Sequence, residues 1–180
     1  MLEWFRKIWG NWQLSRKAGK VERRKRWNGL ENATSIAIIY QVTGKDLFDA
    51  VKELSKRLVG KGKEVVVIGY VESDEIPDYC VAANVGYYFT GNDLNWYGAP
   101  KSDYLHSFIR KPFDLLIDLS VEERYITRYL TTLSPSSLKV GPDLPHTQPV
   151  LDMMIRLEKP GRPEIYILEI LKYLSMIKPA

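Results

Sequence analysis

Two apolar runs with a helical segment between them constrain the fold of this chain more than any other feature. Residues 34–40 and 64–70 are rich in isoleucine and valine and hold few polar side chains, which is typical of parallel strands buried on both faces. A strand–helix–strand unit of this kind predicts parallel pairing with a right-handed crossover. The segment between them, residues 45–59, carries apolar side chains at helical spacing: Leu47, Phe48, Val51, Leu54 and Leu58.

The rest of the chain continues the alternation with shorter segments. Further strands are predicted at 86–90, 113–119 and 137–140, with an edge strand at 150–157. Further helices are predicted after Ser102, at 121–133 and from Pro163 to about Ile177. Thr43 and Ser120 are predicted to cap the helices that follow them. This order of elements predicts a three-layer, Rossmann-like, mostly parallel α/β sheet with helices on both faces.

Composition places the chain among ordinary intracellular domains. Its 180 residues suit one domain, and 45% hydrophobic residues are enough for a core without covalent staples. The single cysteine, Cys80, excludes an intramolecular disulfide and is interpreted as a small packing residue. No apolar run approaches the length of a membrane span, and no secretory signal precedes the first strand. We therefore expect a cytoplasmic protein.

The net charge of +4 is distributed unevenly along the chain. Residues 1–28 hold nine basic and two acidic side chains, whereas the remainder holds 17 basic and 20 acidic ones. A turn signal, Asn28-Gly29, follows the basic stretch. The sequence thus predicts a basic amphipathic N-terminal arm over 1–28 and a Rossmann-like domain over 29–180.

The arm combines aromatic and cationic side chains. Trp4, Phe5, Ile8, Trp9 and Trp12 share one face of a helix that Gly10 weakens and Gly19 ends. We predict docking on an anionic surface, either a membrane leaflet or RNA. The membrane alternative would place the protein at the periphery of the inner membrane. The third alternative is that the indoles pack on the domain or on a second copy. The cations predicted to take part in docking are Arg6, Lys7, Arg16, Lys17, Arg23, Arg24, Lys25 and Arg26.

Candidate catalytic side chains lie where strands are predicted to end. Asp118 closes the strand at 113–119, and Glu123 follows it closely. In open α/β sheets ligands bind beyond the carboxyl ends of the strands, where paired carboxylates can perform acid–base chemistry. Asp46, after the first strand, is a third weak candidate. The competing interpretation is structural, because Ser120 followed by Glu123 forms a capping box, Ser-x-x-Glu.

The start of the helix at 45–59 offers a generic anion site. Gly44 and Lys45 lack the spacing of a phosphate loop, and no dinucleotide fingerprint follows the first strand. Free backbone N–H groups at this helix start could still hold an anion near Gly44, Lys45 and Ser120. The alternative is a solvated helix start without a ligand.

Metal and cofactor chemistry have little support in the sequence. The two histidines, His106 and His146, lie on separate predicted elements. No histidine, cysteine or carboxylate cluster has the spacing of metal ligands, and no serine sits in a Gly-x-Ser-x-Gly elbow. We expect neither a metal nor a cofactor.

Several segments resemble known families. Gly69-Tyr70, residues 94–98, residues 113–118 and residues 137–141 resemble a family of small uncharacterised proteins from Bacteroidetes-type bacteria, which brings no known activity. More distantly, residues 113–141 resemble the N-terminal domain of lipopolysaccharide heptosyltransferase-like glycosyltransferases. In that family a Gly-Asp pair after the first strand supplies a carboxylate near the acceptor sugar, and Asp46 is a loose match to it. The resemblance implies a Rossmann-like half without the second domain that binds the nucleotide-sugar donor.

Three functions remain open from sequence. The favoured one is a non-catalytic binding or scaffolding protein whose arm docks on an anionic surface. The second is a sugar- or nucleotide-binding enzyme with Asp46, Asp118 and Glu123 around a cleft. The third is a subunit of a larger assembly or a homo-oligomer, with Trp96, Tyr97 and residues 87–89 at the interface.

Overall fold

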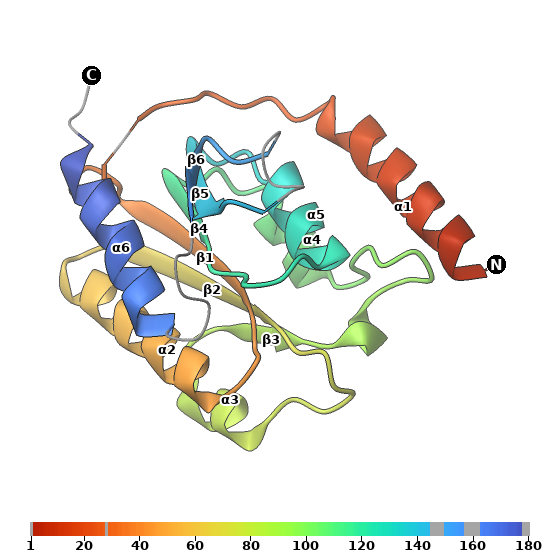
Figure 1. The fold of residues 1–180 in the computed structure, drawn as a ribbon, viewed down its shortest axis with the longest axis horizontal. Coiled ribbons are helices and arrows are strands. Elements are labelled where there is room, and N and C mark those ends of the chain that lie inside the picture. The colour runs from red at the N-terminus through yellow and green to blue at the C-terminus, as the bar shows by residue number, and fades with distance from the viewer. Residues whose placement is uncertain (1, 28, 145–149, 157–162, 178–180) are drawn as a thin grey trace.

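The computed structural model describes residues 2–27, 29–144, 150–156 and 163–177. Helices and strands alternate along most of the chain (Figure 1). The strands are β1 (Ser35–Gln41), β2 (Glu64–Tyr70), β3 (Tyr87–Phe89), β4 (Leu115–Asp118), β5 (Leu138–Pro142) and β6 (Met153–Ile155). The helices are α1 (Leu2–Ala18), α2 (Lys45–Gly60), α3 (Asp78–Ala83), the 3-10 helix η1 (Gly91–Asp93), α4 (Asp103–Phe108), α5 (Tyr125–Leu133) and α6 (Pro163–Met176).

The six strands form one parallel sheet in the order β3-β2-β1-β4-β5-β6. The first strand therefore lies in the middle, where Ile39 pairs with Ile68 on one side and with Asp118 on the other. The strand order reverses between β1 and β4, which makes this pair the topological switch point of the sheet. The expected Rossmann-like α/β architecture is confirmed.

Helices α2 and α6 cover one face of the sheet (Figure 1). Their apolar stripes meet the side chains that β1 and β4 direct to this face, among them Ile36, Ile38 and Ile117. On α6 the buried stripe is Tyr166, Ile167, Ile170 and Leu174, a helical repeat of one face.

Helices α4 and α5 cover the opposite face, and α1 adds to this layer. The alternate residues of the same strands, such as Ala37, Ile39 and Leu116, pack here against Leu130 of α5. Leu14 of α1 is buried in this second cluster. Both faces of the sheet are thus covered, which explains why its strands read as apolar runs without a polar alternation.

Several local expectations were wrong or incomplete. Gly44 occupies the N-cap of α2 without a side-chain cap, so Thr43 does not cap this helix. Helix α5 begins at Tyr125, four residues later than predicted, with Arg124 at its N-cap and no side-chain cap. Ser120 and Glu123 therefore do not form a capping box on this helix. The short elements α3 and η1 were not predicted, and residues 145–149, including His146, lie outside the described residues.

Candidate functional site

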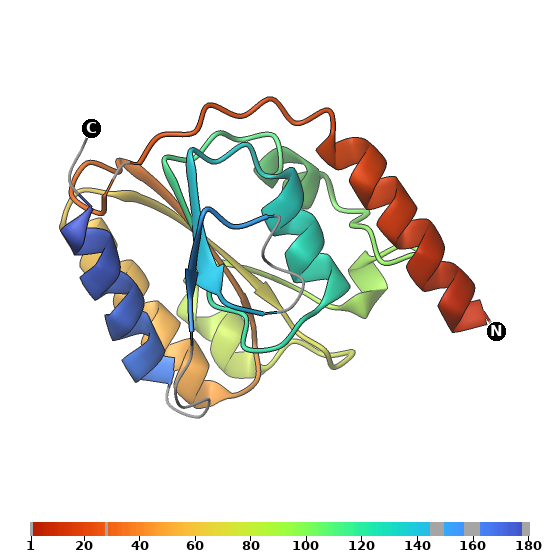
Figure 2. The same ribbon diagram turned by 45° about the horizontal axis from the view of Figure 1, so that its top comes forward.

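Helix α1 is fixed to the body through its less apolar face. The hydroxyl of Tyr125 donates a hydrogen bond to the carbonyl oxygen of Gly10 at 2.8 Å. A Cβ on Gly10 would lie 3.1 Å from the Tyr125 ring and 3.1 Å from the backbone oxygen of Tyr97. Lys17 donates to the hydroxyl of Tyr129 at 2.8 Å. Figure 2 shows α1 lying beside α5, next to the loop that follows β3.

The aromatic face of α1, consisting of Trp4, Phe5, Ile8, Trp9 and Trp12, points to solvent. Its exposed fractions run from 38% for Trp9 to 66% for Trp4. The rings of Trp9 and Trp12 lie 5.3 Å apart, and Trp96 extends the surface at 6.2 Å from Trp9. Their exposure contradicts burial of these indoles against the domain, which is one part of the third sequence alternative, while packing on a second copy stays a prediction.

The cations of the arm have different surroundings. The guanidinium of Arg16 lies over the ring of Trp12 at 5.6 Å. Arg23 is bound by Asp152 and by the carbonyl oxygens of Ser136 and Ser137, and Lys25 also pairs with Asp152. Lys20, Arg24 and Arg26 are exposed, and no described residue pairs with their side chains. The unpaired cations Lys20, Arg24 and Arg26 therefore alternate in sequence with Arg23 and Lys25, which bind Asp152.

A cavity of about 660 Å³ lies between α1 and the body, and we call it the α1 cavity. It is bounded by the end of β2, the loop after β3 and the start of α5. Four cationic side chains and two carboxylates line it, with three half-buried tyrosines between them. The lining residues used below are Arg6, Lys7, Tyr70, Tyr97, Glu123, Arg124, Tyr125 and Arg128.

Two arginines of the α1 cavity are held by carboxylates through their outer nitrogens. Nη2 of Arg124 donates to Glu72 at 2.9 Å and to Glu122 at 3.0 Å. Nη1 of Arg128 donates to Glu123 at 3.0 Å, and its Nη2 donates to Asn11. The Nε of each arginine is buried and has no hydrogen-bond partner among the described residues. Both arginines therefore retain an inner donor that the described protein groups leave unused.

A hydrogen-bonded chain links the α1 cavity to the switch point of the sheet. Gln41 ends β1, is buried, and donates through Nε2 to Glu72 at 3.0 Å. Glu72 in turn accepts from Arg124. The Oε1 of Gln41 is buried without a partner in the described part of the chain. The carboxyl end of β1 is thus connected through Glu72 to Arg124 in the wall of the cavity.

Asp118 is the buried carboxyl at the end of β4. Its Oδ1 accepts from the backbone N–H of Ser120 at 2.9 Å, and its Oδ2 accepts from Thr131 at 3.2 Å. Burial raises the pKa of Asp118 above its ordinary value, although these hydrogen bonds oppose the rise. Asp118, Ser120 and Glu123 line a second cavity of about 20 Å³, which has room for roughly one water.

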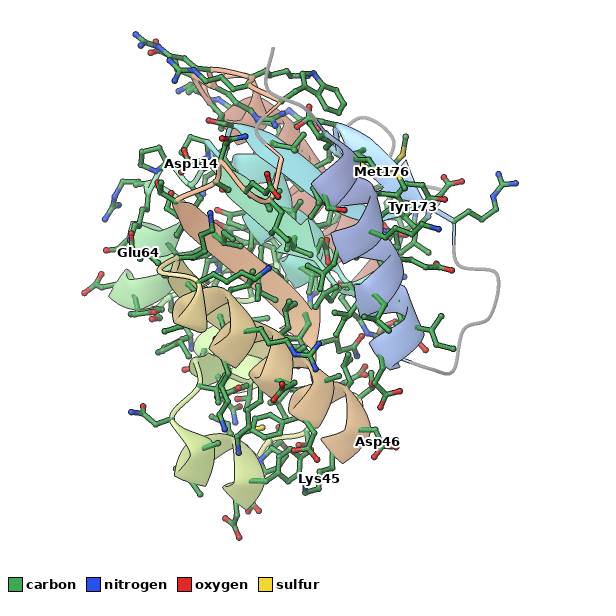
Figure 3. The ribbon with its side chains drawn as sticks, turned by 90° about the vertical axis from the view of Figure 1, so that its left-hand side faces the viewer. Lys45, Asp46, Glu64, Asp114, Tyr173 and Met176 are labelled. Atoms are coloured by element: carbon green, nitrogen blue, oxygen red, sulfur yellow. The ribbon has the colours of Figure 1, made fainter. Side chains whose placement is uncertain are left out.

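The other predicted site residues lie apart from these two carboxylates. Lys45 and Asp46 begin α2, which covers the face of the sheet opposite to α5. They lie at the end of the molecule away from Asp114 and Glu64 (Figure 3). Lys45 pairs with Asp49 one turn along its own helix, and neither Gly44 nor Asp46 lines either cavity. The structure therefore brings Asp118 together with Glu123 but does not bring Asp46 to them.

Asp114, at the other end of β4, has a structural environment. Its Oδ2 accepts from the backbone N–H and the hydroxyl of Thr34 at 2.8 and 2.7 Å. Burial alone would raise the pKa of Asp114, but these hydrogen bonds and those from Ser35 hold it below its ordinary value. Asp114 thereby ties the loop before β1 to β4.

The remaining candidates for chemistry offer little. Cys80 is buried in α3, and burial raises the pKa of its thiol to about 11, so little thiolate forms at neutral pH. Among residues 2–27, 29–144, 150–156 and 163–177, no group of three His, Cys, Asp or Glu side chains is placed to hold a metal ion.

Sequence reasoning named Arg6, Lys7, Tyr97 and Glu123 in other roles but missed Arg124 and Arg128, and it did not place these residues around one cavity. Arg124 and Arg128 lie four apart at the start of a helix, which places them on one side of it. That spacing, beside the carboxylates Glu122 and Glu123, was the available signal. The sequence could not predict that Arg6 and Lys7 lie near α5, because their position depends on how α1 docks on the body.

Comparison with known proteins gives a family without an assigned activity. No curated protein matches the sequence. None of the described helices combines the length and apolarity needed to cross a bilayer. The resemblance of residues 113–141 to glycosyltransferase domains stays a prediction. The model of a family of unknown function, DUF6913, matches residues 6–177. Because this match covers nearly the whole chain, the protein belongs to the DUF6913 family.

Proposed function

We propose that this protein binds the surface of anionic membranes through the aromatic face of α1. The observation that carries the proposal is the outward orientation of that face. A helix on a globular body normally directs its apolar stripe to the core. Here Trp4, Phe5 and Trp12 are about half exposed or more, while Gly10 and Lys17 contact α5. A contiguous exposed apolar surface of this kind is characteristic of an interaction site.

The chemistry of the aromatic face suits the boundary between lipid headgroups and acyl chains. Indole rings are enriched at that depth because their bodies are apolar and their N–H groups can reach polar partners. Trp96 adds a fourth indole beside Trp9 and enlarges the surface that can enter the interface. Nearby cations, beginning with Arg16, each add about 1 kcal/mol of attraction to an anionic leaflet.

Docking of α1 on the body also lowers the cost of membrane binding. A free amphipathic peptide must fold when it reaches the lipid, and that ordering opposes binding. In this protein the hydrogen bond from Tyr125 to Gly10 and the buried side chain of Leu14 hold the helix before any contact with lipid. The aromatic face is thus preorganised for the surface.

The distribution of charge favours lipid over RNA. RNA binding requires cations interleaved with the stacking rings, so that each base and its phosphate are contacted together. Among the described cations, Arg16 alone lies against a ring of the aromatic face, whereas Lys17 and Arg23 are engaged by groups of the protein. A surface rich in indoles with cations at its margin fits a leaflet better than a single strand.

Vesicle flotation of the full chain tests the proposal. The protein should float with vesicles of phosphatidylglycerol and phosphatidylcholine, and less with phosphatidylcholine alone. The double variant Trp9→Ala, Trp12→Ala should weaken binding at least about tenfold, since burying half of two large side chains exceeds roughly 1.4 kcal/mol. Trp27→Ala is the matched control, because Trp27 is 51% exposed but lies outside α1.

Three results would contradict membrane binding. The first is an absence of flotation with anionic vesicles. The second is equal weakening by Trp27→Ala and by the double variant. The third is loss of RNA retention or of self-association in the double variant while flotation stays unchanged, which would assign the aromatic face to RNA or to a second copy. Sedimentation equilibrium and filter retention supply these two readouts.

A further inference from the structure

We propose that the α1 cavity binds a phosphorylated small molecule, with Arg6, Lys7, Arg124 and Arg128 as the groups that hold its phosphate. The proposal does not depend on membrane binding, because the aromatic face lies on the opposite side of α1 from the residues that line the cavity. The proposed ligand would bind at the carboxyl edge of the sheet, where the sequence analysis placed Asp118 and Glu123 as catalytic candidates.

The position of the α1 cavity follows the rule for open parallel sheets. Ligands of such sheets bind beyond the carboxyl ends of the strands, near the point where strand order reverses. The cavity is lined by Tyr70 at the end of β2 and by the first residues of α5, which follows β4. The chain from Gln41 through Glu72 to Arg124 joins it to the end of β1.

The cations of the cavity are incompletely used by the protein. Arg6 and Lys7 have no side-chain partner within the described ranges. Arg124 and Arg128 are already oriented by carboxylates, yet the Nε of each is buried and unpaired there. Guanidinium groups held in place in this way are suited to phosphate oxygens.

The start of α5 adds a further positive contribution. Arg124 occupies the N-cap without a side-chain hydrogen bond, so the first N–H groups of the helix lack a capping acceptor. Tyr125 and Ile126, the first two residues of the helix, both line the cavity. The positive end of the helix dipole therefore acts on the same space as the four cations.

The remaining walls indicate that the ligand is larger than a phosphate ion. The volume of about 660 Å³ falls within the range of roughly 300–1,000 Å³ found for small-molecule sites. Tyr70, Tyr97 and Tyr125 provide ring faces, and Gly98 allows the close approach of the Tyr125 ring, whose Cδ1 lies 2.9 Å from the position of a Cβ there. A nucleotide or a sugar phosphate would use both the rings and the cations.

Calorimetric titration of the full chain tests the assignment, with pyrophosphate, ADP and adenosine as probes. Pyrophosphate and ADP should bind saturably, and adenosine, which lacks phosphate, should bind far more weakly. Arg6→Gln and Lys7→Gln should each weaken ADP binding at least about tenfold, since each variant loses a charge-assisted hydrogen bond to phosphate. Lys20→Gln and Arg24→Gln remove the same charge from the arm outside the cavity and should leave the affinity unchanged.

The outcomes separate the possible explanations. The proposal is overturned if no soluble probe binds saturably at millimolar concentration and the cavity variants also leave flotation with phosphatidic acid unchanged. Equal weakening by the cavity variants and the two control variants overturns it as well. A lipid headgroup offers the same phosphate chemistry, so vesicles containing phosphatidic acid form a second arm. If Arg6→Gln and Lys7→Gln weaken flotation while soluble probes do not bind, the phosphate comes from lipid. Circular dichroism of each variant verifies that the fold is retained.

Discussion

The hydroxyl of Tyr125 donates a 2.8 Å hydrogen bond to the carbonyl oxygen of Gly10, which joins α1 to α5 across 115 residues of sequence. The approach is close because Gly10 has no side chain: a Cβ there would lie 3.1 Å from Cζ of Tyr125. This contact holds α1 with its aromatic face outward and its cations over the cavity.

Enlarging Gly10 should loosen α1. In Gly10→Val the added atoms meet the Tyr125 ring and the backbone of Tyr97, so we expect the free energy of unfolding to fall by about 1–3 kcal/mol, as for overpacked sites. Urea denaturation measures this loss, and faster trypsin cleavage within α1 reports its release. Gly60→Val is the control, because nothing lies within 4 Å of a Cβ at Gly60. Equal losses in both variants would show that the contact is unimportant.

Removing Arg23 should destabilise the protein far more than removing its neighbour. The side chain of Arg23 is 12% exposed and that of Asp152 is 6% exposed, so Arg23→Ala leaves a carboxylate almost without solvent, with Lys25 and the backbone N–H of Lys139 as partners in the described part of the chain. We expect a loss of roughly 3 kcal/mol in the free energy of unfolding. Arg24→Ala, on an exposed side chain, should cost little. Chemical denaturation of both variants makes the comparison, and similar values would remove the structural role assigned to Arg23.

Lys139 should make stability depend on pH above neutrality. It is buried in β5, donates to the carbonyl oxygen of Thr132 at 3.1 Å, and lies near Arg23, Lys25 and Asp152. Burial, followed by the charge of Arg23, lowers its pKa from 10.5 to about 7. Between these values the unfolded chain binds more protons than the folded protein, so the free energy of unfolding rises with pH.

Replacing this lysine isolates its contribution. The free energy of unfolding of the wild type minus that of Lys139→Met should increase as the pH rises from about 7 toward 10.5. Its slope should be no more than about 1.4 kcal/mol per pH unit. Denaturation at a series of pH values measures it. A difference that stays constant with pH would mean that Lys139 remains charged in the folded protein.

Asp118 should act in the opposite direction at acidic pH. Its pKa is raised above 3.8 in the folded protein, chiefly by burial. The folded state therefore keeps a proton that the unfolded state loses, and this contribution to stability decreases as the pH rises from 3.8 through the folded pKa. Asp118→Asn is uncharged throughout, so its stability relative to wild type should increase from acidic to neutral pH. Parallel curves for the two proteins would refute the assignment.

The sheet could be predicted from sequence because burial on both faces leaves a clear pattern. Residues 34–40 and 64–70 read as apolar runs, and they form β1 and β2 within one residue of the expected bounds. Strand order left no comparable signal, since the pairing of β1 with β4 depends on long-range packing. Helix α3 was missed because six residues are too few to show a periodicity.

The candidate site could be predicted only in part. The edge of the sheet followed from the rule for parallel strands, and Asp118 was found because it ends a strand. The α1 cavity could not be predicted, because Arg6 and Arg128 are brought together by the docking of α1 on α5. The same docking decided which side of α1 faces solvent, which helical spacing alone does not specify.

The contact between Gly10 and Tyr125 also sets an order of events during synthesis. Helix α1 leaves the ribosome before α5, and its docking surface is completed only after the 115 residues up to Tyr125 have been translated. Until then the docking side of the nascent helix is exposed as well as its aromatic face, and both are available to chaperones or to nearby lipid. A contact of such long range also slows the final folding step, because the chain between its ends must be ordered before the contact can form.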